Sequence, residues 1–113
     1  MSFKKNKYAV LRNALSTELS GFIYKYFLLK RTAAKTLLDE KHISPYNVDW
    51  GGWNDAQVPN TYCAYGDVAM DTLLAELKPL MEKETGLKLY ETYSYARIYK
   101  KGDVLKRHKD RFS

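Results

Sequence analysis

A histidine and an aspartate, His108 and Asp110, stand two positions apart near the C-terminal end of the sequence. They follow a strand that we predict to begin at Val104, and residues two apart on an extended chain point to the same side of a sheet. One imidazole and one carboxylate can supply two of the three protein ligands of a non-haem Fe(II) site. The spacing alone is not specific, so the alternative that both are surface residues of a basic hairpin stays open.

Two amphipathic helices are predicted upstream of this pair. The first begins after an N-cap at Ser16 and carries apolar residues at i, i+3, i+4 and i+7 spacing over about 24 residues. The second spans Asp67–Thr85 and stops before Gly86, a residue typical of a helix C-terminus. Pro79 within it predicts a kink or a break near Leu77. The apolar stripes of both helices indicate a packed core.

Strands and loops account for the rest of the chain. Short strands are predicted at Tyr8–Leu11, across 87–99 and again at 104–108, with a turn at Lys100–Asp103. Residues 42–66 have no periodicity and form a long loop of the kind that often carries function. Its aromatic residues could line a substrate groove or fold onto the body as an apolar plug: Tyr46, Trp50, Trp53, Tyr62 and Tyr65.

The C-terminal segment resembles the Fe(II)- and 2-oxoglutarate-dependent oxygenases, specifically the prolyl 4-hydroxylase-like group. In that group a segment of the type Arg-Tyr-x-x-Gly leads into His-x-Asp. Here the run Arg97-Ile98-Tyr99-Lys100-Lys101-Gly102 is followed six positions later by His108. A looser similarity extends over nearly the whole chain, including Ile43–Tyr46 and Gln57–Tyr62.

The resemblance implies a role for three residues. His108 and Asp110 match metal ligands, and Tyr99 matches a tyrosine whose phenol contacts 2-oxoglutarate. A second tyrosine of the family, three residues before the histidine, is replaced here by Leu105, which puts that contact in doubt. The implied cofactor is Fe(II) and the implied cosubstrate is 2-oxoglutarate, with ascorbate as a further candidate. Such enzymes convert 2-oxoglutarate to succinate while they hydroxylate a C–H bond of their substrate. The resemblance makes protein-bound proline one candidate substrate.

The implied fold is α+β, with N-terminal helices that support the first strands of a double-stranded β-helix, or jelly roll. The family's distal histidine and the basic residue that follows it have no counterpart up to Ser113, and His42 is predicted at the end of the first helix. A jelly roll needs about eight strands, of which 87–113 supplies two or three. We therefore expect a single incomplete oxygenase domain over 1–113, with helical support and the aromatic loop in 1–86 and the first jelly-roll strands in 87–113.

An incomplete ligand set predicts weak iron binding and little or no turnover, so whether this chain is itself an enzyme stays open. Cys63 is the single cysteine, which excludes an internal disulfide and a multi-cysteine zinc cluster and favours a reducing, cytoplasmic setting. No apolar run reaches about 18 residues, so we predict no transmembrane helix and no membrane partner. Unpaired edges on the strands near 92–99 and 104–108 predict homo-oligomerisation.

The charge of the chain supports an alternative function. The sequence of 113 residues has 19 Lys and Arg against 13 Asp and Glu, a formal net charge of +6. Its basic residues concentrate between Lys100 and Arg111, close to aromatic residues. A small basic α+β module that binds nucleic acid is therefore the alternative interpretation. The oxygenase interpretation instead predicts a protein or peptide substrate and no nucleic-acid partner.

Overall fold

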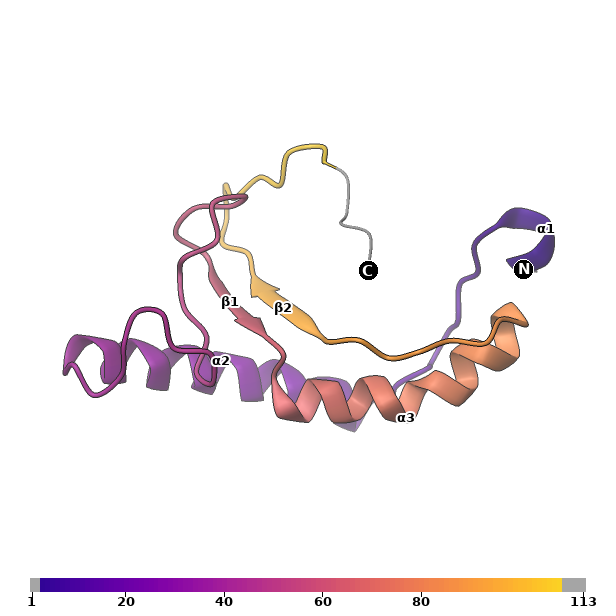
Figure 1. Cartoon of the computed structure of the whole chain (residues 1–113), viewed down its shortest axis with the longest axis horizontal. Helices are drawn as coiled ribbons and strands as arrows, with labels where there is room; N and C mark the ends of the chain where they lie inside the picture. The colour runs from indigo at the N-terminus through magenta and orange to yellow at the C-terminus, as the bar shows by residue number, and fades with distance from the viewer. Residues whose placement is uncertain (1–2, 109–113) are drawn as a thin grey trace.

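The protein has an α+β fold with three helices and one two-stranded antiparallel sheet, seen in a computed structural model that describes residues 3–108. The elements follow the order α1 (Phe3–Asn6), α2 (Thr17–Asp39), β1 (Tyr62–Tyr65), α3 (Val68–Thr85) and β2 (Tyr95–Ile98). Figure 1 shows α2 and α3 along the long axis of the molecule, with the sheet on one side of them. The α+β prediction is confirmed at this level. None of the helices in the described part of the chain is long and apolar enough to cross a membrane.

Helix α2 begins and ends where its sequence predicts. The Ser16 side chain accepts a hydrogen bond from the Leu19 N–H at 3.1 Å, which satisfies one of the unpaired donors of the first turn. The helix ends at Asp39, and His42 lies just beyond it, with its Nε2 atom 3.3 Å from Glu40. The predicted helix after Ser16 is confirmed.

Helix α3 is also capped as predicted. The Asp67 side chain accepts from the Met70 N–H at 3.0 Å, and Gly86 closes the helix in the left-handed conformation with φ 72°. The helix continues through Pro79, so the predicted break does not occur, and the alternative of a kink stays a prediction. One missing N–H removes a single hydrogen bond, and the neighbouring turns keep theirs.

The core lies between α2 and one face of the sheet. Antiparallel pairing sets Tyr62 opposite Ile98 and Ala64 opposite Ala96, so these four side chains share the face that packs on α2. Around the buried centre lie partly buried side chains from α2, the loop, α3 and β2: Ile23, Tyr26, Trp53, Met70, Ala96 and Ile98. The centre itself consists of Phe27, Ala34, Tyr62 and Ala64.

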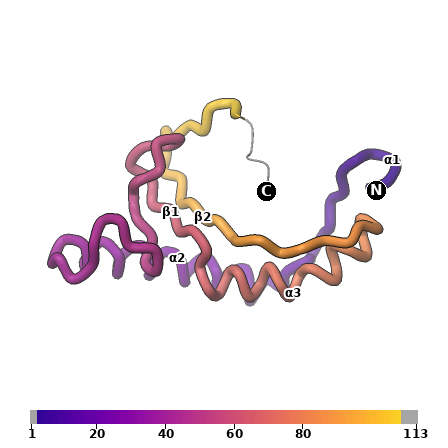
Figure 2. The backbone as a smooth tube through the Cα atoms, in the orientation of Figure 1, coloured from indigo at the N-terminus to yellow at the C-terminus, as the bar shows by residue number. Residues whose placement is uncertain are grey.

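Most of the predicted strand across 87–99 is not a strand. Only Tyr95–Ile98 pairs with β1, while 87–94 is an extended segment that follows α3 back toward the sheet (Figure 2). Side chains of α3 bind its backbone: the Leu89 N–H donates to Glu82 at 2.9 Å and the Ser94 N–H donates to Asp71 at 2.7 Å. Carboxylates of α3 thus take hydrogen bonds that a partner strand would otherwise take.

Two further strand predictions are wrong. Tyr8–Leu11 and the segment from Val104 to His108 have no regular secondary structure, because no other strand in the described chain lies beside either of them. Conversely, the structure has a strand where the sequence predicts a loop, because Tyr62–Tyr65 at the end of the predicted loop 42–66 forms β1. The turn at Lys100–Asp103 is confirmed, with the Asp103 N–H bonded to the Lys100 carbonyl at 3.0 Å.

Candidate functional site

The structure places two of the three predicted site residues. Tyr99 directly follows β2 and is 48% exposed. His108 is exposed and lies in no strand, and its Nδ1 atom is 2.9 Å from the Lys106 carbonyl oxygen. Asp110 lies outside the described residues. The predicted strand that begins at Val104 is therefore absent over the described residues up to His108. How His108 and Asp110 lie relative to each other stays a prediction.

A tight turn connects Tyr99 to the segment that holds His108. The Asp103 carboxylate accepts the Lys100 N–H at 2.6 Å, and this bond is the main reason that the pKa of Asp103 lies below its usual range. The Lys100 ammonium lies 3.1 Å from the same carboxylate and donates to the Asn60 carbonyl at 2.8 Å. These contacts fix the direction in which the chain leaves β2.

Arg97 forms a polar cluster on the sheet face that points away from α2. Its guanidinium pairs with Asp55 from the long loop and donates to the Tyr95 hydroxyl at 2.7 Å, while that hydroxyl donates to Asp55. The bond from Tyr95, followed by the Gln57 N–H and Arg97, lowers the pKa of Asp55. Asp55 is therefore a carboxylate that anchors the loop to β2.

One atom of this cluster lacks a partner. The Arg97 side chain is only 6% exposed, and its Nε atom is buried without a hydrogen-bond partner in the described structure. The guanidinium carbon lies 5.9 Å from the centre of the Tyr99 ring. A cavity of about 290 Å³ lies between β2 and α2 and is lined in part by Arg97 and Tyr99, while the Arg97 guanidinium itself pairs with Asp55 on the opposite face of the sheet. A buried donor left unpaired is costly, so an acceptor supplied by a ligand would stabilise this arrangement.

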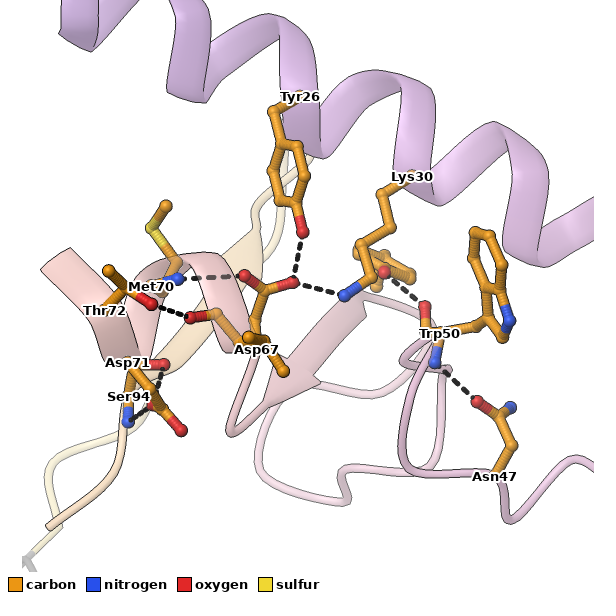
Figure 3. Close-up of polar contacts among 11 residues, drawn as sticks. Tyr26, Lys30, Asn47, Trp50, Asp67, Met70, Asp71, Thr72 and Ser94 are labelled. Carbon is orange, nitrogen blue, oxygen red and sulfur yellow. Dashed lines mark hydrogen bonds and ion pairs between the residues drawn. The ribbon is translucent and has the colours of Figure 1, made fainter.

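A second polar cluster joins α2 to the start of α3 (Figure 3). The Asp67 carboxylate, whose side chain is 2% exposed, accepts from the Lys30 ammonium and, at 2.6 Å, from the Tyr26 hydroxyl. Burial alone would raise the pKa of Asp67, but the hydrogen bonds from Lys30, Tyr26 and the Met70 N–H outweigh it and lower that pKa. Burial, with the bond to Asp67, raises the pKa of Tyr26 to about 12.

The Lys30–Asp67 pair lines a groove that is larger than the cavity between β2 and α2. The groove has a volume of about 650 Å³ and is lined by α2, by the loop at 48–50 and by the junction of β1 and α3. Because the two charges neutralise each other and are both buried, we assign this pair to the attachment of α3 onto α2. Its hydrogen bonds contribute to the fold rather than to a reacting centre.

Sequence reasoning missed Asp55, Arg97 and Lys30 as members of polar clusters. Arg97 stood in the motif but received no role, and Asp55 was one residue of an aperiodic loop. Arg97 and Asp55 are 42 residues apart in the sequence, and Lys30 and Asp67 are 37 residues apart. Patterns among neighbouring residues do not predict contacts between positions this far apart in the sequence.

No described part of the chain gathers three His, Cys, Asp or Glu side chains into a group that could hold a metal ion. Asp110 lies outside the described residues, so a site that includes it stays a prediction. Comparison with protein-family models, with curated proteins and with solved structures found no match for the chain.

Proposed function

We propose that this chain is the N-terminal part of an Fe(II)- and 2-oxoglutarate-dependent dioxygenase that hydroxylates a C–H bond, with protein-bound proline as one candidate substrate. The observation that carries the proposal is the buried, unpartnered Nε atom of Arg97 beside Tyr99. Tyr95, Arg97 and Tyr99 are two residues apart along an extended chain, so their side chains point to the same side of it. The chain then turns at Lys100–Asp103 and leads to His108.

The donor set fits a small dicarboxylate. A guanidinium binds carboxylates through charge-assisted hydrogen bonds, and Arg97 has a donor to spare after it has satisfied Asp55. Tyr99, with a half-exposed ring, can add a phenolic hydrogen bond. In this proposal Arg97 and Tyr99 position 2-oxoglutarate, and the two strands are the first of a jelly roll.

His108 and Asp110 would hold the iron. The metal, when bound, supplies the oxidative chemistry that couples 2-oxoglutarate decarboxylation to hydroxylation. An imidazole and a carboxylate are the ligand types that non-haem Fe(II) sites use. The turn at Lys100–Asp103 sets how the ligand-bearing segment leaves β2, and Asp55 holds Arg97 in place on the sheet.

An anaerobic titration with Fe(II) tests the proposal, with quenching of tyrosine and tryptophan fluorescence as the readout. The unmodified chain should show saturable quenching, and His108→Ala should abolish it. His42→Ala is the matched control, because His42 is the second histidine of the chain and is also exposed. Equal quenching in the His108→Ala variant would contradict the proposal.

A second candidate function, nucleic-acid binding, is favoured by the exposed basic segment after β2. Lys101, Lys106 and Arg107 are exposed and form no ion pair with the described residues. Aromatic residues beside such cations can stack on bases. A steep fall in oligonucleotide affinity with added salt, reduced in a Lys106→Ala/Arg107→Ala variant, would support this candidate, and salt-independent or undetectable binding would exclude it.

A further inference from the structure

The outer edge of β2 carries open backbone hydrogen-bonding groups. The Gly66 N–H donates to the Ser94 carbonyl at 2.8 Å, and the antiparallel register then directs the backbone groups of Ala96 and Ile98 toward β1. The N–H and C=O groups of Tyr95 and Arg97 therefore point to the opposite side. No hydrogen bond within the described chain satisfies these two N–H groups.

The other edge of the sheet is already occupied. Gly52 exchanges two backbone hydrogen bonds with Cys63, each 2.9 Å long, on the side of β1 that faces away from β2. Of the two edges of this sheet, that of β2 is consequently the one able to accept a further strand.

The surface beside the open edge is apolar. The cavity of about 290 Å³ lies there, and α2 contributes four side chains to it: Ile23, Tyr24, Phe27 and Leu28. Tyr24 is 66% exposed. Helix α2 thus extends past β2 and offers an apolar surface on which a wider sheet could rest. A strand added at the edge would both pair with β2 and cover this surface.

We propose that two copies of this chain associate through this edge, with β2 of each copy pairing antiparallel about a twofold axis at Ala96. This pairing requires neither iron nor 2-oxoglutarate, although it involves Arg97 and Tyr99, which the proposed function assigns to 2-oxoglutarate. A twofold interface uses one surface twice, and an open antiparallel edge is complementary to itself. About four backbone hydrogen bonds would form, through Tyr95 and Arg97 of each copy.

Side-chain pairing selects this register. With the axis at Ala96, each Arg97 lies opposite Tyr95 of the second copy, a favourable cation–π neighbour, and Tyr99 lies opposite Tyr93. Moving the axis by one residue to Arg97 would set two guanidinium groups directly opposite each other.

Single cysteines test the register in a Cys63→Ser background. Ala96 would face itself across the axis at a Cα–Cα distance of about 4.5 Å, which suits a disulfide. Ala96→Cys should therefore cross-link under mild oxidation. Ile98→Cys should not, because two copies of residue 98 would lie about 13 Å apart along the strands. Ile98→Cys should instead cross-link when mixed with Ser94→Cys, which it would face.

Sedimentation of the unmodified chain tests the association itself. The mean mass should rise toward that of a dimer with concentration, and Tyr95→Pro should weaken dimerisation by about tenfold or more, because proline removes an outward N–H. Tyr95→Ala loses the same side chain but keeps the N–H, so it should associate more tightly than Tyr95→Pro. A monomer at every concentration, equal affinities of the two Tyr95 variants, or equal cross-linking of Ala96→Cys and Ile98→Cys would overturn the proposal.

Discussion

The Arg97 guanidinium carbon lies 5.9 Å from the centre of the Tyr99 ring, and the Arg97 Nε atom beside it is buried and unpaired in the described structure. If this donor receives a carboxylate of 2-oxoglutarate, Arg97→Met should weaken binding of that acid by about tenfold or more, the loss expected for a charged hydrogen bond. Binding can be measured by calorimetry with Mn(II) in place of iron. Arg107→Met, a change at an exposed arginine, should have no comparable effect, and equal losses in both variants would argue against a specific role of Arg97.

The buried ion pair between Lys30 and Asp67 predicts a large stability change. Asp67→Asn keeps a side chain able to cap α3 but leaves the buried Lys30 charge without its partner, so the free energy of unfolding should fall by about 3 kcal/mol. Chemical denaturation followed by circular dichroism measures this value. Adding Lys30→Met to that variant should recover part of the loss.

The matched control is Asp39→Asn, which removes an exposed ion pair with Lys35 on α2. Solvent screens that pair, so the free energy of unfolding should change by less than about 0.5 kcal/mol. Similar effects at Asp39 and Asp67 would show that the burial of Asp67 contributes nothing.

The lowered pKa values of Asp55 and Asp67 predict how stability depends on pH. A carboxyl group whose pKa is lower in the folded state than in the unfolded chain stabilises the fold above the unfolded value of about 3.9. That contribution is lost as the pH falls through the folded pKa. The free energy of unfolding, measured between about pH 7 and pH 2, should therefore decline below about pH 4. The decline should be shallower in Asp67→Asn.

Two glycines should respond to alanine in opposite directions. Gly51 has φ 79°, and a Cβ atom there would lie 2.6 Å from the Cys63 carbonyl oxygen, so Gly51→Ala should destabilise the fold by about 2 kcal/mol or more. Gly21 lies inside α2 with open space around it, so Gly21→Ala should stabilise by about 0.5–1 kcal/mol. Thermal unfolding of both variants checks the signs, and a stabilising Gly51→Ala would contradict the described loop conformation.

The helices could be predicted from the sequence because their signals are local. Ser16, Asp67 and Gly86 mark helix ends by side-chain or backbone chemistry that acts within a few residues. The apolar spacing predicts the packed face only in part, because Phe27 and Ala34 of α2 are buried but Phe22 is 65% exposed and α3 has no buried residue. Neither signal depends on the rest of the fold.

The sheet and the polar clusters could not be predicted in the same way. The pairing of β1 with β2 and the contact between Asp55 and Arg97 join distant parts of the sequence. The segment at 87–94 has strand-like composition, yet Asp71 and Glu82 bind its backbone from α3. The strand predicted at Val104 rested on composition and a preceding turn, and lacks a neighbouring strand in the described chain.

Paramagnetic broadening by Mn(II), which binds the same ligand types as Fe(II), tests the oxygenase proposal most directly. In NMR spectra the ring signals of His108 should broaden at low stoichiometry, those of His42 should stay sharp, and His108→Ala should remove the specific effect. Equal broadening of both histidines, or none at His108, would contradict a metal site at this position.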